Sequence, residues 1–221
     1  METKQIAVLG LSRFGVSVAR SLTEFGAEVM GVDIDKEKVA DISHEITHAV
    51  QADILDGEAL EALGLRNFDV VVLSIKDVEI SCLAIIALKD HGAGRVVAQA
   101  SGEAHAKILE RIGADKVIMP ERDMGTRLAR SLAGENIIDY MELSARHSLM
   151  EIEALEEWVG HTLKDSNIRS RYGINVVAIR SGKTLRVSPQ GDDLIHDGDV
   201  LVDIGENSDL EKLHKIKKRK K

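Results

Sequence analysis

The sequence predicts an α/β fold, in which a doubly wound parallel sheet is followed by a small α+β domain. Through the first 119 of the 221 residues, short apolar runs alternate with segments of helical periodicity. After Pro120 the alternation stops, and turns such as Ser181-Gly182 and Asp197-Gly198 separate the apolar runs. Alternating strands and helices are typical of a parallel sheet, and the change of pattern indicates a second domain.

The first domain is predicted to contain six strands, which alternate with helices. The run 70–73 is almost entirely apolar, as expected for a strand buried on both faces. The helix over 56–63 starts at Asp56, a good N-cap, and Gly64 follows its end. The predicted strands are 5–9, 28–32, 48–52, 70–73, 95–98 and 116–119, and the predicted helices are 14–25, 36–45, 56–63, a segment around 80–88 that Gly92 ends, and 103–112.

The second half of the chain is predicted to begin with a helix near Glu121, with Met124, Leu128 and Leu132 on one face. Extended segments are then expected at 137–143, 148–155, 174–179, 184–187 and 200–204, and a last helix at 207–216. We therefore predict a nucleotide-binding domain over 1–134, a linker over 135–145, an α+β domain over 146–216 and a basic tail over 217–221.

Composition excludes several classes of protein. A net charge of −8 disfavours broad nucleic-acid binding, so no nucleic-acid partner is expected. Cys82 is the single cysteine, which excludes an intrachain disulfide and fits a reducing cytoplasm. No apolar stretch approaches the ~18–20 residues that span a bilayer. Residues 215–221 carry six positive charges, which suit either a solvated end or a contact with anionic lipid headgroups.

The first strand is followed directly by the turn Gly10-Leu11-Ser12-Arg13-Phe14-Gly15. Strand, glycine turn and helix form the start of a Rossmann-like nucleotide-binding unit. Gly10 allows the sharp turn and Gly15 allows the helix to pack closely on the sheet. The middle position, usually glycine, is Ser12. Its hydroxyl either donates to a phosphate oxygen or is tolerated with the phosphates slightly farther away.

Two charged residues extend this motif. Asp33 ends the second strand, where an acid accepts hydrogen bonds from ribose hydroxyls and repels a 2′-phosphate. Arg13 stands beside the expected phosphate position and either points to solvent or binds a terminal phosphate, including one held by a neighbouring subunit. The alternative is a degenerate fold that keeps the turn for packing alone.

The sequence shows no catalytic constellation. The eight histidines are scattered, without metal-ligand spacing on one helix. Cys82 falls in an apolar helix, which favours a core position over a nucleophile. A small NAD-dependent oxidoreductase would need an acid–base residue that the sequence does not offer. A nucleotide-sensing transcription factor is disfavoured by the acidic charge and the lack of a helix-turn-helix.

Several sequence strings, taken together and in order, resemble the RCK (regulator of potassium conductance) family, which combines TrkA-N and TrkA-C domains in bacterial Ktr and Trk potassium-uptake systems. The Ktr-type gating subunits are the most similar. The strings are 7–15, 32–35, 65–69, 112–115, 120–125, 168–175 and 187–189. Two stretches depart from the family pattern: Ser12 replaces a glycine, and 74–79 replaces a segment that contains glycine.

The resemblance implies a cytoplasmic homo-oligomer at the inner face of the cell membrane, built from dimers into an octameric ring and docked under a potassium channel or transporter. Its ligands would be ATP or ADP, with NAD(H) in Trk-type relatives, a divalent cation and cyclic di-AMP. The implied nucleotide-binding residues are Gly10, Ser12, Arg13, Phe14, Gly15, Asp33, Asp53, Ile54 and Lys76. Glu121 would join the cation site, and cyclic di-AMP would contact Ile168, Arg169, Ile174, Asn175 and Pro189.

Overall fold

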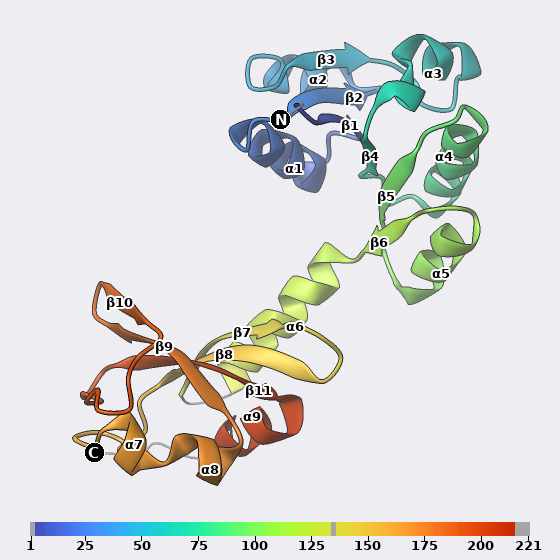
Figure 1. The fold of residues 1–221 in the computed structure, drawn as a ribbon. Coiled ribbons are helices and arrows are strands. Elements are labelled where there is room, and N and C mark those ends of the chain that lie inside the picture. The colour runs from blue at the N-terminus through green and yellow to red at the C-terminus, as the bar shows by residue number, and fades with distance from the viewer. Residues whose placement is uncertain (1–2, 134–135, 215–221) are drawn as a thin grey trace. The chain divides into compact units, whose positions relative to one another are not determined.

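The computed structural model describes residues 3–133 and 136–214 of the chain. Its contacts divide the chain into two compact units, Met1–Pro120 and Glu121–Lys221. Each unit has its own sheet and its own apolar core (Figure 1). The predicted α/β fold class is confirmed.

The first unit is a six-stranded parallel sheet in the order β3-β2-β1-β4-β5-β6. All five strand pairs are parallel, and β1 lies between β2 and β4, where the order of the strands reverses. The strands are β1 (Gln5–Leu9), β2 (Glu28–Asp33), β3 (His48–Gln51), β4 (Val70–Leu73), β5 (Arg95–Gln99) and β6 (Lys116–Ile118). All six predicted strands are therefore confirmed, with ends shifted by one residue at most.

Helices cover both faces of this sheet, because its strands are apolar on both sides (Figure 1). One core holds Ala19 of α1 and Ile42 of α2, and the other holds Leu60 of α3, Ile85 of α4 and Leu109 of α5. The helices are α1 (Arg13–Glu24), α2 (Lys36–Ile42), α3 (Gly57–Leu63), the 3-10 turn η1 (Leu65–Asn67), α4 (Val78–Asp90) and α5 (Glu103–Arg111). The predicted cap is present, since the Asp56 carboxylate accepts from the Glu58 amide at 3.0 Å.

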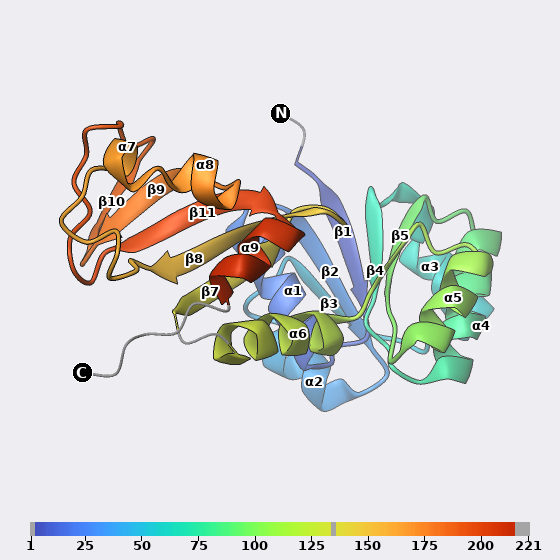
Figure 2. The ribbon, with the colours of Figure 1, turned by 90° about the horizontal axis from the view of Figure 1, so that it is seen from below.

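The second unit contains a five-stranded antiparallel sheet in the order β10-β9-β11-β8-β7. Helices α7, α8 and α9 lie on one face of it (Figure 2), and the side chain of Trp158 is buried in the apolar core of this unit. The elements are α6 (Pro120–Ala133), β7 (Ile137–Glu142), β8 (His147–Glu153), α7 (Leu163–Ser166), α8 (Ile168–Tyr172), β9 (Asn175–Ser181), β10 (Thr184–Val187), β11 (Val200–Glu206) and α9 (Asn207–His214).

The division of the chain differs from the predicted boundaries. Residues 137–142, expected in the linker, form the edge strand β7, which pairs with β8 along its length. Helix α6, expected in the first domain, belongs to the second unit, where Arg127 forms an ion pair with Asp139 of β7. The ion pair joins α6 to β7, a contact between segments that the periodicity of the helix does not predict. The basic tail 217–221 lies outside the described residues.

Three further differences concern helices. Helix α2 ends at Ile42 rather than at residue 45. Helices α7 and α8 were not predicted, because four and five residues are too few to establish a period. The apolar face of α6 is not buried within the described residues, and the Met124 side chain is 58% exposed. None of the described helices is long and apolar enough to cross a membrane.

Candidate functional site

The glycine turn joins the end of β1 to the start of α1. The Gly10 amide donates to the Val32 carbonyl at 2.8 Å, and its φ of +90° favours glycine. A Cβ on Gly10 would lie 2.7 Å from the carbonyl oxygen of Ser74, and one on Gly15 would collide with the Gly10 carbonyl oxygen. Packing alone therefore requires glycine at both positions.

The amino end of α1 offers donors for an anion. The Ser12 hydroxyl caps the helix by accepting from the Gly15 amide at 3.2 Å, while the Val16 amide bonds to the Ser12 carbonyl. In the described part of the chain, no acceptor is found for the amides of Ser12, Arg13 and Phe14. Free amides and the helix dipole together attract phosphate. The exposed Arg13 side chain adds a full positive charge to this end of the helix.

Asp33 is buried at the end of β2 and braces the turn. One of its carboxylate oxygens accepts from the Leu11 amide at 2.7 Å, and the other accepts from the Asp35 amide at 2.9 Å. Lys38 forms an ion pair with the same carboxylate at 3.2 Å. The Lys38 side chain is about half exposed, whereas the Asp33 carboxylate that it contacts is buried.

The other predicted nucleotide residues follow the ends of β3 and β4. The carboxyl ends of parallel strands meet at one edge of a sheet, so these loops share an edge with the turn. Asp53 and Lys76 are exposed there, and the Asp53 carboxylate accepts from the Leu55 amide at 2.9 Å. The Ile54 side chain is instead buried in the core, so only its backbone is available to a base.

The predicted cation residue, Glu121, lies in the exposed first turn of α6 beside Asp123. Both carboxylates are placed where the helix dipole favours them. Among the described residues, no group of three or more His, Cys, Asp or Glu side chains is arranged to hold a metal ion.

The five residues predicted to contact cyclic di-AMP divide into two groups. Arg169 and Asn175 are exposed and Pro189 is half-buried. The Ile168 and Ile174 side chains are 2% and 0% exposed and belong to the core of the second unit. In this structure only the first three present their side chains to a ligand.

Comparison with known proteins agrees with this two-part architecture. A model of the TrkA-N domain matches residues 6–120, and a model of the TrkA-C domain matches residues 149–218. Over 96% of both chains, the sequence is 44% identical to Ktr system potassium uptake protein C of Bacillus subtilis (strain 168). The chain belongs to the Ktr family. Ktr system potassium uptake protein A is 37% identical in B. subtilis, over 96% of both chains, and 31% identical in Vibrio alginolyticus, over 94% of both chains.

Solved structures share the fold of this Ktr protein at low sequence identity. The GsuK RCK domain is 16% identical with a TM-score of 0.69, and the match covers 96% of this chain and 47% of that one. The GsuK channel bound to NAD is 15% identical with a TM-score of 0.70, and the match covers 100% of this chain and 41% of that one. These likenesses support the fold.

The TrkA-N domain of this Ktr protein contains a buried histidine that sequence reasoning missed. Nδ1 of His105 accepts from the Ser101 amide at 3.1 Å, so Nε2 carries the proton and donates to Ser81 Oγ at 2.8 Å. The Ser81 hydroxyl donates in turn to the carbonyl of Asp77. Burial lowers the pKa of His105, which keeps the ring neutral. Because the ring donates to Ser81, it does not act as a base that activates the hydroxyl.

The TrkA-C domain contains a second residue that sequence reasoning missed. Asp203 lies on β11 opposite Met150 of β8 and Val176 of β9. It is 0% exposed, and neither carboxylate oxygen has a hydrogen-bond partner among the described residues. Burial raises the pKa of Asp203 to about 8, so the carboxyl is mostly protonated at neutral pH. A single acid inside the apolar run 200–204 is the signal that could have found it.

Proposed function

We propose that this protein is a regulatory gating subunit of a potassium uptake system, and that it senses ATP and ADP at the glycine turn. The observation that carries the proposal is the amino end of α1, where free amides and the exposed Arg13 meet at the end of β1. The sequence relationship to Ktr system potassium uptake proteins supports the potassium system. The alternative is an NAD(H)-responsive regulator or a small NAD-dependent oxidoreductase.

The mechanism rests on the difference between two nucleotides. ATP and ADP differ by one charged phosphoryl group, and a guanidinium forms strong, directional hydrogen bonds to a terminal phosphate. A ligand shifts a conformational equilibrium only by its difference in affinity for the two states. Arg13, extended from the turn or reaching across a subunit contact, binds the terminal phosphate of ATP, which ADP lacks. The two nucleotides therefore favour different conformational states to different extents.

Two apolar surfaces support assembly into a homo-oligomer. On the first unit, Leu83 and Ile86 of α4 are 48% and 45% exposed, and Ile108 of α5 is 43% exposed. On the second unit, Met124 and Leu128 of α6 are both more than half exposed. Exposed apolar stripes of this kind mark protein contacts. We assign them to neighbouring subunits in a dimer-based, octameric ring, which docks on a membrane potassium subunit at the cytoplasmic side.

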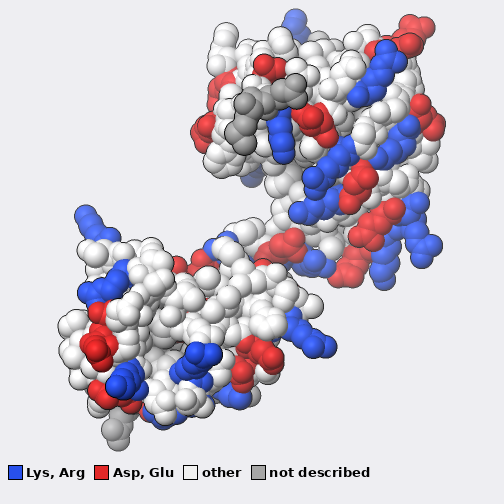
Figure 3. Space-filling view, in the orientation of Figure 1, with Lys and Arg blue, Asp and Glu red and all other residues white. Residues whose placement is uncertain are grey.

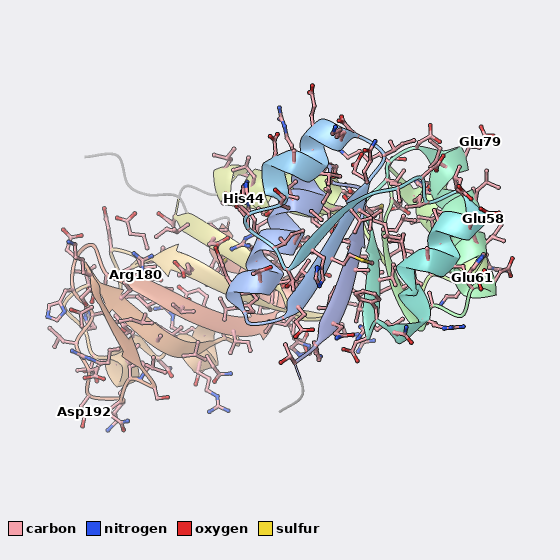
Figure 4. All side chains as sticks on the ribbon, turned by 90° about the horizontal axis from the view of Figure 1, so that it is seen from above. His44, Glu58, Glu61, Glu79, Arg180 and Asp192 are labelled. Carbon is pink, nitrogen blue, oxygen red and sulfur yellow. The ribbon has the colours of Figure 1, made fainter. Side chains whose placement is uncertain are left out.

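Surface charge disfavours a nucleic-acid partner. Lys and Arg are interspersed with Asp and Glu on the face shown in Figure 3, and no continuous basic surface is visible there. The carboxylates of Glu58 and Glu61 on α3, and of Glu79 on α4, are exposed and point outward (Figure 4). Such a surface repels a phosphate backbone.

Two side chains that could act in catalysis are unsuited to it. The Ser81 hydroxyl accepts a hydrogen bond from His105 and donates its own proton to the Asp77 carbonyl, so no base among the described residues is placed to activate it. Cys82 packs against the core, and burial raises the pKa of its thiol, which leaves less thiolate at neutral pH. We therefore propose that the protein binds nucleotide without transforming it.

A ligand screen tests the proposed function. ATP and ADP are each expected to raise the melting temperature, because a ligand present at 100 times its Kd stabilises the folded state by about 2.7 kcal/mol. NADH and cyclic di-AMP complete the panel, with Arg169→Ala as the control for binding in the TrkA-C domain. Stabilisation by NADH alone, or hydride transfer across a substrate panel, would contradict the proposal and favour the alternative.

The cation proposal for Glu121 has its own test. If Glu121 binds a divalent cation shared with nucleotide phosphates, Mg²⁺ should tighten ATP binding in the native protein and much less in Glu121→Gln. Calorimetric titration of ATP with and without Mg²⁺ measures this effect. Asp123→Asn is the matched control, since it removes a carboxylate from the same helical turn. An unchanged Mg²⁺ effect in Glu121→Gln would leave only helix-dipole capping for Glu121.

A further inference from the structure

A chain of three side chains links the ends of three strands at the glycine turn. The Ser12 and Ser74 hydroxyl oxygens are 2.6 Å apart, and Ser74 Oγ donates to Gln99 Oε1 at 3.2 Å. Ser12 follows β1, Ser74 follows β4 and Gln99 ends β5. Ser74 and Gln99 are almost completely buried, at 2% and 1% exposure. We call this chain the serine bridge.

Counting protons fixes the direction of the serine bridge. A hydroxyl has one proton, and that of Ser74 goes to Gln99. The proton between the two serines therefore comes from Ser12, whose oxygen also accepts from the Gly15 amide. The Ser12 hydroxyl has then used its only donor within the protein. In this arrangement it is not a phosphate donor, which leaves the turn amides and Arg13 for that task.

The serine bridge crosses the place where a dinucleotide would pass. In the order β3-β2-β1-β4-β5-β6, the sequence of strands reverses between β1 and β4. A dinucleotide lies across the crevice at this reversal, with one half on each side. The first half would occupy the β1–β2–β3 side, which holds Asp33. The second half would have to cross between the ends of β1 and β4, where Ser12 and Ser74 are bonded.

The residues around the serine bridge prevent Ser12 and Ser74 from moving farther into the protein. A Cβ on Gly10 would lie 2.9 Å from Cγ1 of Ile75, and one on Gly15 would lie 3.2 Å from Cβ of Ser74. The loop after β4 thus packs directly on the turn. The backbone of Ser12, with a φ of −65°, suits any residue, so its conformation does not require serine at this position.

We propose that the serine bridge makes Ser12 and Ser74 specificity-determining residues, which restrict the site to a mononucleotide. This inference rests on the proposed function, in that the turn binds a nucleotide. The adenosine half and its phosphates end at the amino end of α1. Continuation of a pyrophosphate toward β4 requires the Ser12–Ser74 hydrogen bond to break.

The test compares NADH with ATP on the full-length protein by calorimetric titration. Ser12→Gly removes the side chain, and Ser12→Gly with Ser74→Ala clears both sides of the crevice. The double variant should raise the affinity for NADH relative to ATP by roughly tenfold, because one or two hydrogen bonds no longer need to be broken. Ser74→Ala alone keeps the cap of α1 and should give an intermediate shift. Ser17→Ala, an exposed serine on α1, is the control and should give none.

The outcomes separate this inference from the proposed function. If the native protein binds ATP and the ratio of affinities stays unchanged in the double variant, the serine bridge does not determine specificity. If the native protein already binds NADH more tightly than ATP, the inference is likewise wrong, while nucleotide sensing stands. If it binds no nucleotide at all, the proposed function itself fails. Melting temperatures measured without ligand identify any variant that is unfolded.

Discussion

Replacement of Arg13 by alanine is expected to reduce the preference for ATP over ADP by about tenfold or more. A hydrogen bond between charged groups contributes about 1.5–3 kcal/mol, and 1.4 kcal/mol corresponds to tenfold in affinity. The two nucleotides differ only at the terminal phosphate, to which we propose that the guanidinium of Arg13 binds. Calorimetric titration of both nucleotides gives the ratio directly. Because the Arg13 side chain is exposed, the melting temperature of the protein without ligand should change little.

Arg20→Ala is the matched control for this result. It removes the same charge from the same helix, at a position where the guanidinium pairs with Glu45 rather than facing the turn. Its discrimination between ATP and ADP should equal that of the native protein. Equal discrimination in the Arg13 variant as well would show that another group distinguishes the terminal phosphate.

Replacement of Asp203 by asparagine is expected to change the pH dependence of stability more than any other single substitution in the TrkA-C domain. Burial raises the pKa of Asp203 from 3.8 to about 8, so the folded state keeps a proton that the unfolded state loses. The native protein should therefore lose about 1.4 kcal/mol of unfolding free energy per pH unit between about pH 4 and pH 8. Asparagine keeps a similar shape without a charge, so this contribution should disappear.

Urea unfolding at pH 6, 7 and 8 measures the effect. Trp158 is the single tryptophan and is fully buried in the TrkA-C domain, so its fluorescence reports on this domain. The variant should gain stability over the native protein as the pH rises. The exposed Asp197→Asn is the control and should keep the native slope. A native slope that persists in the Asp203 variant would mean that Asp203 is ionised in the folded protein.

Local sequence patterns in the TrkA-N domain, such as apolar runs and the glycine turn, predicted most of its structure. An apolar run such as 70–73 is long enough to pair and too apolar to face water, so its place inside the sheet follows from sequence alone. Gly10 and Gly15 were identified from the pattern of strand, glycine turn and helix, and the structure shows that a Cβ at Gly10 would clash with Ser74 and one at Gly15 with the Gly10 carbonyl. The same approach placed Asp33 beside the turn, since the ends of β1 and β2 are neighbours.

Local patterns were less informative where a segment depends on distant partners. The segment 137–143 was predicted to be extended but was placed in the linker, because its pairing with β8 is not visible in its own composition. The resemblance to the RCK family implied a ligand contact for Ile168 and Ile174, and the structure places their side chains in the TrkA-C core. Asp203 is unusual only because β8 and β9 enclose it.

The glycine turn shows the division between sequence and structure most clearly. The sequence by itself determined the strand, the turn and the helix that follows it, because steric limits on the backbone act between near neighbours. It also showed that Ser12 replaces the expected glycine, but gave no reason for the replacement. Only the tertiary structure brought Ser74 and Gln99, which lie 62 and 87 residues farther along the chain, against that hydroxyl. A hydroxyl has one proton to give, and the group that receives it is decided by packing across strands.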